Sequence, residues 1–171
     1  MPPEYVPEIA TLLAEAKAGR RQIYASTLMI AEVRPSWLKS KSYDNFQDFV
    51  ADFEGALNLI GPTPTILMQA ARLRGHSYHR TPKQAGEKNR VMSGMDAVHL
   101  ATCLHIRDVL GISDIEFHTF DDGKGKNYEE RAVSLLNFQD FSVHVANDPD
   151  VATLCKLPRI KPSHPAPQLD L

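Results

Sequence analysis

Apolar residues at helical spacing alternate with short β-favouring runs along the first third of the chain. One apolar face predicts a helix over Pro7–Arg20, and the run Gln22–Ser26 predicts a strand. The stretch TLMIAEVRP that follows predicts a short helix, which Pro35 would stop. Aromatic and aliphatic residues then predict a helix over Tyr43–Leu57, followed by a brief strand, LNLI.

Two further helices carry recognisable start and stop residues. The stretch PTPTILMQAARLRG has Thr63 as the expected N-cap, Pro64 in the first turn and Gly75 at its close. The stretch SGMDAVHLATCLHIRDVLG predicts a helix that ends at Gly111. Between the two, residues 76–94 are polar and basic without a sustained period, which predicts a long loop. Long loops inside compact domains are often functional.

The last third of the chain predicts two strands, one helix and a tail. DIEFHTF (Asp114–Phe120) and FSVHV (Phe141–Val145) are the expected strands, and NYEERAVSLL between them is the expected helix. From Ala146 onward prolines are frequent, which predicts an extended or disordered segment. We therefore expect one domain over residues 1–146 and a proline-rich tail over 147–171.

This order of elements favours the α/β class. Strands separated by helices imply a parallel sheet with helices on both faces, an α/β/α sandwich. In such sheets the ligand site lies at the carboxyl ends of the strands. A length of 171 residues and a hydrophobic content of 43% suit a single domain with its own core.

The composition of the chain indicates in which compartment the protein acts and which kinds of partner it binds. No apolar run approaches the roughly 20 residues that a bilayer-spanning helix needs, and the start MPPEYVPEIA does not resemble a signal peptide. The two cysteines, Cys103 and Cys155, fit a reducing compartment, so we expect a cytoplasmic protein without a membrane partner. A formal net charge of −2 means that a nucleic-acid partner must be met by a local basic patch.

Acidic residues occupy three of the element ends where a ligand is expected. Glu32 lies in the helix after the first strand, Asp96 at the head of its helix, and Asp121, with Asp122 beside it, ends the strand EFHTF. Convergent carboxylates repel one another unless a cation holds them, and Mg²⁺ or Mn²⁺ is the usual partner of oxygen ligands. Such an ion can activate water and neutralise phosphoryl charge in a phosphodiester hydrolysis.

Each of these acids also has a structural explanation. Taken alone, Asp96 is favoured as a helix cap or first-turn acid, Asp121 as the start of a turn, and Glu32 as an exposed helix residue. His99 fits a histidine packed among apolar neighbours and is left out of the metal set. An unrelated hydrolase or nucleotide-binding domain is disfavoured because the sequence has no glycine-rich phosphate loop and no G-x-S-x-G motif.

Taken together, these segments resemble the PIN-domain family, in particular the VapC-type toxin ribonucleases of bacterial toxin–antitoxin pairs. STLMIAEV resembles the family's stretch that ends in an acidic residue, here Glu32. MDAVHLATC is close to the family's Asp-Ala-x-His-Leu-Ala pattern, here with Asp96. FHTFDDG resembles the Thr-x-Asp strand end, here with Thr119 and Asp121. The resemblance covers about Pro7–Val145.

The resemblance implies a metal-dependent endoribonuclease in which Glu32, Asp96 and Asp121 are catalytic and bind Mg²⁺ or Mn²⁺. Asp122 is a further candidate ligand. The resemblance also implies an RNA substrate, a homodimer and a cognate antitoxin protein. Because nucleic-acid affinity rests largely on phosphate contacts, the candidate substrate-binding residues are polar or basic residues near the acids: Thr119, Lys124, Lys126 and Arg90.

The chain departs from the family at its start. PIN domains begin with a central strand that ends in an aspartate, whereas this chain begins at what would be the following helix. The early acids Glu4 and Glu8 are not assigned as ligands. We therefore expect a PIN-like sandwich without its first central strand and with weak or no nuclease activity. The alternative function is that of a PIN-like module that binds protein or RNA without cleaving it.

Overall fold

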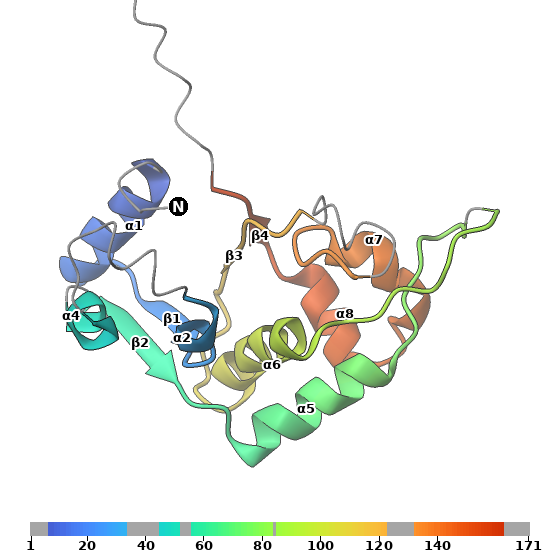
Figure 1. Cartoon of the computed structure of the whole chain (residues 1–171), viewed down its shortest axis with the longest axis horizontal. Coiled ribbons are helices and arrows are strands. Elements are labelled where there is room, and N and C mark those ends of the chain that lie inside the picture. The colour runs from blue at the N-terminus through green and yellow to red at the C-terminus, as the bar shows by residue number, and fades with distance from the viewer. Residues whose placement is uncertain (1–6, 34–44, 52–55, 84, 123–131, 163–171) are drawn as a thin grey trace, which may run out of the picture. The chain divides into compact units, whose positions relative to one another are not determined.

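The computed structural model describes residues 7–33, 45–51, 56–83, 85–122 and 132–162 (Figure 1). The chain divides into two compact units, residues 1–61 with 162–171 and residues 62–161. Each unit contains a two-stranded parallel sheet together with helices. The α/β class is confirmed at this level. None of the described helices is both long and apolar enough to cross a membrane.

The first unit is built around the pairing of two short strands. Its described elements are α1 (Pro7–Lys17), β1 (Ile23–Ser26), α2 (Met29–Glu32), α4 (Phe46–Ala51) and β2 (Leu57–Ile60). β1 and β2 lie side by side and run parallel (Figure 1). In their register Ile23 is opposite Leu57 and Ser26 is opposite Ile60. Gly19 takes a φ of 70° just after α1, a conformation that glycine adopts without strain at helix ends. The predicted strands of this unit are confirmed.

One helix of the first unit is shorter than its apolar pattern predicted. The pattern indicated a helix over Tyr43–Leu57, but α4 ends at Ala51 and Leu57 begins β2. Residues 43–44 and 52–55 lie outside the described part of the chain. The reason for the difference at Leu57 is that the run LNLI pairs with β1 over its whole length, so its residues take strand geometry.

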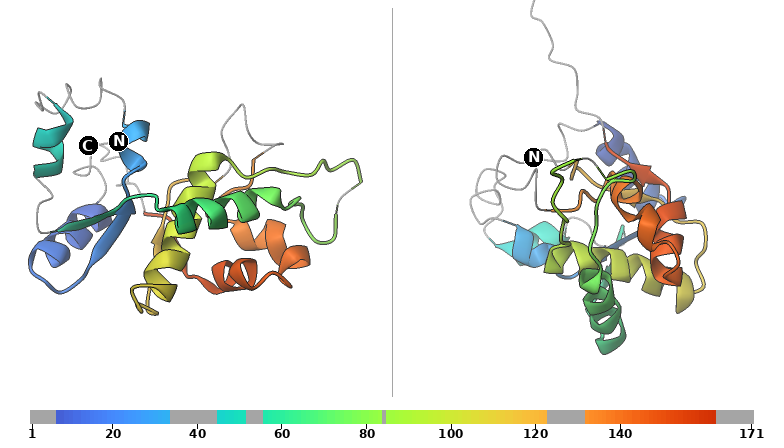
Figure 2. Two further views of the ribbon diagram at one scale, coloured as in Figure 1. Left: turned by 90° about the horizontal axis from the view of Figure 1, so that it is seen from below. Right: turned by 90° about the vertical axis from the view of Figure 1, so that its right-hand side faces the viewer.

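Two packed helices form the centre of the second unit. α5 (Pro64–Gly75) and α6 (Gly94–Asp108) contact each other and lie side by side in Figures 1 and 2. Thr63 is the predicted N-cap of α5, since its hydroxyl accepts the Ile66 N–H at 3.3 Å. The fully or almost fully buried side chains of these helices recur three or four residues apart, as a packed face requires: Ile66, Ala70, Leu73, Ala97, Leu100, Ala101 and Leu104.

The segment between α5 and α6 is irregular, as expected. It extends away from the helices of the second unit in Figure 2, with Tyr78 and Arg90 joined by an isolated antiparallel bridge. Tyr78 anchors its base: the side chain is buried, and its hydroxyl donates to the Leu73 carbonyl at 2.6 Å. The loop therefore begins from a fixed point on the helical core.

The expectation of a strand at Phe141–Val145 is wrong. The structure has α7 (Phe138–Ser142) followed by a single 3₁₀ turn over Val143–Val145. Alternating Phe, Val and Val suggested a strand, but Phe138 and Phe141 are both buried, three residues apart, on one helical face. A run this short satisfies either period, and packing of the two phenylalanines favours the helix.

The expectation of an extended or disordered tail from Ala146 is wrong for its described part. Residues 149–156 form α8 (Pro149–Lys156), which contacts α6 and α7. Asp148 is the N-cap of α8, and its carboxylate accepts the N–H groups of Asp150 and Val151. Pro149 occupies the first turn, where the backbone N–H that proline lacks would have no partner within the helix. Pro149, which the sequence analysis took as a sign of an extended tail, therefore marks the start of a helix. Residues 163–171 lie outside the described part.

A second parallel pair follows α8. β3 (Phe117–His118) pairs with β4 (Arg159–Ile160), and backbone bonds extend the pairing to Pro158 and Thr119. The strand expected over Asp114–Phe120 is thus confirmed only at its centre. The helix expected over NYEERAVSLL is wrong for its described residues 132–136, which are irregular. Their backbone groups bond Val91 and Asp121 instead of forming a helical turn.

Candidate functional site

Asp96 lies in the first turn of α6, where Ser93 is the N-cap. The Ser93 hydroxyl accepts the Asp96 N–H at 3.1 Å and donates to the Asp96 carboxylate at 2.5 Å. The carboxylate of this third helical residue accepts from the hydroxyl of the cap, whereas the acid of a capping box accepts the backbone N–H of the cap. The cap role considered for Asp96 therefore belongs to Ser93. The carboxylate is half-buried and stands at the positive end of a helix of 15 residues, which favours its ionised form.

Asp121 follows β3 and is fixed by an irregular segment. Its carboxylate accepts the Leu135 N–H at 2.9 Å, and its carbonyl accepts the Leu136 N–H and the Ser134 hydroxyl, each at 3.0 Å. Its own N–H donates to the Thr119 hydroxyl at 3.1 Å. These four bonds fix the backbone and side chain of Asp121 at the end of the strand. Thr119 therefore has a local structural role here.

Residues 132–136 join the two acidic positions. On one side, Ala132 forms a parallel bridge with Val91, and the Val133 N–H donates to the Val91 carbonyl at 3.2 Å. Val91 comes two residues before the Ser93 cap of α6. On the other side, Ser134 and Leu135 bond Asp121. The segment therefore lies between the chain that leads into Asp96 and the chain that ends in Asp121.

Lys161 and Asp122 meet at the edge where β3 and β4 end. The Lys161 ammonium lies 2.6 Å from the Asp122 carboxylate. Asn137 adds a bond from its side-chain amide to the Asp122 carbonyl at 3.4 Å. Because β3 and β4 are parallel, their carboxyl ends lie on the same edge, which is the usual place for ligands.

Three residues of this edge were not predicted from the sequence: Ser134, Asn137 and Lys161. Ser134 and Asn137 fell in and after an expected helix, and their contacts depend on the irregular path of residues 132–137. Lys161 belongs to the segment 147–171, which the sequence analysis expected to be a tail. A signal for it was present, because Pro158 and Pro162 bracket the run Arg-Ile-Lys, and proline is tolerated at the ends of edge strands.

Arg159 stabilises the backbone of Leu135, the residue whose N–H binds the Asp121 carboxylate. Its guanidinium donates to the carbonyls of Leu135 at 2.8 Å, Leu154 at 2.7 Å and Leu157 at 3.0 Å. Burial lowers the pKa of the Arg159 guanidinium, and the nearby thiols of Cys155 and Cys103 act in the opposite direction. The group stays charged at neutral pH because arginine titrates far above it. Arg159 thus holds the carbonyl of the residue whose N–H holds Asp121.

The remaining predicted site residues are distributed differently. Glu32 is exposed in α2 of the first unit, whereas Asp96, Asp121 and Asp122 belong to the second. Arg90 is half-buried, donates to the Ala132 carbonyl at 3.1 Å and lies 4.3 Å from the ring centre of Phe141. These contacts give Arg90 a structural role in the loop base. Lys124 and Lys126 lie outside the described residues.

The expected three-carboxylate set is divided between the two units, with Glu32 in the first and Asp96 and Asp121 in the second. In the described part of the chain, no three or more His, Cys, Asp or Glu side chains are grouped so as to hold a metal ion. The three predicted acids of the second unit each bond a protein donor: Asp96 bonds Ser93, Asp121 bonds the Leu135 N–H, and Asp122 bonds Lys161.

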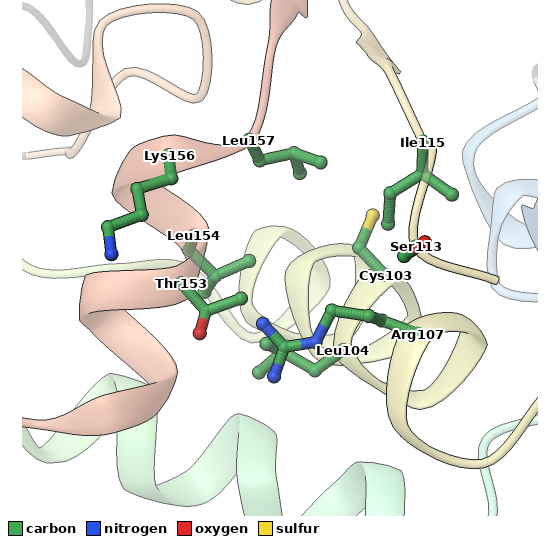
Figure 3. A pocket seen from close by; sticks show the side chains of 9 residues that line it. All are labelled: Cys103, Leu104, Arg107, Ser113, Ile115, Thr153, Leu154, Lys156 and Leu157. Atoms are coloured by element: carbon green, nitrogen blue, oxygen red, sulfur yellow. The ribbon is translucent and has the colours of Figure 1, made fainter. Parts of the chain in front are cut away.

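A cavity of about 260 Å³ lies elsewhere in the second unit, between α6, α8 and residues 113–115 (Figure 3). Apolar side chains dominate it, and two cations border it, Arg107 and Lys156. Arg107 is already bonded to the neighbouring Asp108 at 2.7 Å. None of the sequence-predicted site residues lines this cavity. It is therefore separate from the acidic strand end in composition and in the elements that form it.

Comparisons with protein-family models, with curated proteins and with solved structures find no match to this chain. The assignment of a function therefore rests on the residues themselves and on their geometry.

Proposed function

We propose that this chain is a PIN-like, metal-dependent endoribonuclease that hydrolyses RNA phosphodiester bonds. The observation that supports the proposal most is the link made by residues 132–136, which bond Asp121 on one side and pair with the chain leading into Asp96 on the other. Two acids that stand far apart in the sequence thus belong to one bonded network at strand and helix ends. The motifs around both acids are those that resemble the PIN family.

The proposal includes the wider properties that the resemblance implies. The fold would be a PIN-like α/β/α arrangement, and the protein would act in the cytoplasm as the toxin of a toxin–antitoxin pair. Its partners would be RNA, a cognate antitoxin and a second copy of the chain. Mg²⁺ or Mn²⁺ would supply water activation and neutralise phosphoryl charge. The chain's own contribution at Asp121 is a carboxylate whose direction is set by the Leu135 N–H.

A second candidate function is favoured by a separate observation. The described residues hold no grouping of three metal-capable side chains, and Asp96, Asp121 and Asp122 each have a protein donor. That arrangement suits a PIN-like module that binds RNA or protein without cleaving it. The two candidates differ in whether the full chain binds a divalent ion through Asp121.

Calorimetric titration of the full chain with Mn²⁺ separates the two candidates. The nuclease proposal predicts binding that Asp121→Asn removes, while Asp114→Asn, an exposed acid before β3, leaves it intact. Asparagine retains an oxygen acceptor for the Leu135 N–H, so the variant tests charge and not folding. Absence of Mn²⁺ binding by the wild type favours the second candidate. Binding that Asp121→Asn leaves unchanged contradicts the proposed ligand set.

A further inference from the structure

Lys161 places a positive charge at the acidic strand end. The residue directly follows β4, and Asp122 follows β3 by four positions, so their ion pair closes the edge at which the two parallel strands end. The backbone around both is fixed, because the Phe117 N–H donates to Pro158 at 2.8 Å and the Thr119 N–H donates to Ile160 at 2.9 Å. The ammonium is therefore presented from a held strand.

We propose that Lys161 binds a phosphate group of RNA at this edge, an inference that rests on the proposed function. Its ammonium has three N–H donors, and the contact with Asp122 uses one of them. The Lys161 side chain is 39% exposed, against 23% for Asp122, so the cation is the more accessible partner of the pair. A phosphate that approaches Asp121 and Asp122 is repelled by both carboxylates, and Lys161 offsets that repulsion.

Asp122 has the supporting role in this arrangement. Its carboxylate directs the Lys161 ammonium, while Asn137 bonds its carbonyl. A partly exposed lysine–aspartate pair contributes little to folding stability, because its Coulomb energy is screened by water. The contact therefore suits positioning of the lysine better than it suits holding the two strands together. Asp122, with Lys161 on its carboxylate, is a positioning residue.

The competing explanation is that the pair only joins β3 to β4. The two explanations predict different signs for the two partners. If the pair is purely structural, removal of either charge changes RNA affinity no more than the same charge change at the control positions Lys156 and Asp114. If Lys161 binds phosphate, its removal weakens RNA binding, whereas Asp122→Asn frees the ammonium from its partner and maintains or tightens binding.

The experiment is fluorescence anisotropy of a short labelled single-stranded RNA with the full chain, in EDTA and at several salt concentrations. Lys161→Met is expected to weaken binding severalfold and to reduce the slope of log affinity against log salt by about 0.7, the value of one phosphate contact on a single strand. Lys161→Arg is expected to restore most of the binding. Lys156→Met removes the same charge from the end of α8, and Asp114→Asn is the matched control for Asp122→Asn.

Three results overturn the proposal. They are equal affinities and slopes for Lys161→Met and Lys156→Met, a loss in Asp122→Asn as large as that in Lys161→Met, and no RNA binding by the wild type. Because EDTA removes divalent ions, these results do not depend on cleavage. RNA cleavage together with an unaffected Lys161→Met would refute the lysine assignment and leave the proposed function intact. Weakened binding by Lys161→Met without any cleavage would support the lysine and count against the nuclease.

Discussion

His76 and Asp148 are hydrogen-bonded at 3.0 Å, and this contact joins the end of α5 to the start of α8. The Asp148 carboxylate also accepts two backbone N–H groups as the N-cap of α8 and lies 3.5 Å from the Arg72 guanidinium. Partial burial acts to raise the pKa of Asp148, but the bond to His76, the two N–H groups and the charge of Arg72 together lower it. One carboxylate thus stabilises a helix and an interhelical contact.

Loss of this carboxylate should destabilise the second unit. Asp148→Ala removes the N-cap and the His76 bond, and we expect the free energy of unfolding to fall by about 2 kcal/mol. Asp148→Asn keeps a good N-cap acceptor, so its loss should be about half as large. Urea denaturation measures both. Asp140→Asn, on an exposed first-turn acid of α7, should change stability by less than about 0.5 kcal/mol; an equal loss there would contradict the role of Asp148.

The lowered pKa of Asp148 also makes stability depend on pH in the acid range. In the unfolded chain the carboxyl titrates near its ordinary value of 3.8, and in the folded chain it titrates lower. Its contribution is therefore complete above the unfolded pKa and is lost as the pH falls through the folded pKa. The stability difference between wild type and Asp148→Asn should therefore stay constant down to the ordinary pKa of 3.8 and narrow as the pH falls below it. A difference that stays constant below that pH, or widens on acidification, would refute this assignment.

Arg159 should be among the most sensitive positions of the second unit. Arg159→Met leaves three carbonyls without their charged donor and removes the guanidinium that lies 5.1 Å from the ring centre of Phe138. We expect a loss of about 3 kcal/mol in the free energy of unfolding. Arg107→Met, which removes a contact with the adjacent Asp108, should cost less than about 1 kcal/mol. Similar losses at both positions, measured by thermal or urea unfolding, would show that the carbonyl contacts contribute little.

Cys103 should be unreactive in the folded protein although it lines a cavity. Burial raises the pKa of its thiol to about 12, so that only about one molecule in ten thousand carries the thiolate at pH 8. In a Cys155→Ser background, iodoacetamide should label Cys103 very slowly in buffer and readily in denaturant, as mass spectrometry would show. Native labelling at the rate of the unfolded chain would mean that the thiol is not desolvated.

The elements that the sequence predicted correctly are those with local signals. Thr63 and Pro64 mark the start of α5, and the apolar period of α6 exceeds three turns, so capping and periodicity agree before any tertiary contact is considered. The parallel pairing of β1 with β2 also followed from strands separated by helices. The placement of Asp121 at a strand end followed from the break after EFHTF.

The elements that the sequence did not predict depend on contacts between distant residues. β4 has two residues, and its strand geometry comes from pairing with β3 across 42 positions, as between Phe117 and Arg159. Residues 132–136 have a helical apolar spacing, yet their N–H groups bond Val91 and Asp121. The prolines that bracket β4 suggest a short strand, but only the pairing with β3 places Lys161 at the site. The acidic half of the candidate site was therefore predicted from the sequence, and its cation was not.

The most direct test of the account is Mn²⁺-dependent cleavage of single-stranded RNA by the wild type and by Asp96→Asn. Asparagine can still accept the Ser93 hydroxyl, so the head of α6 is retained while the charge is removed. The nuclease proposal predicts weak but measurable cleavage by the wild type, at least about a tenfold loss in Asp96→Asn, and wild-type activity in Asp114→Asn. Unchanged cleavage by Asp96→Asn, or no cleavage by the wild type, would contradict it.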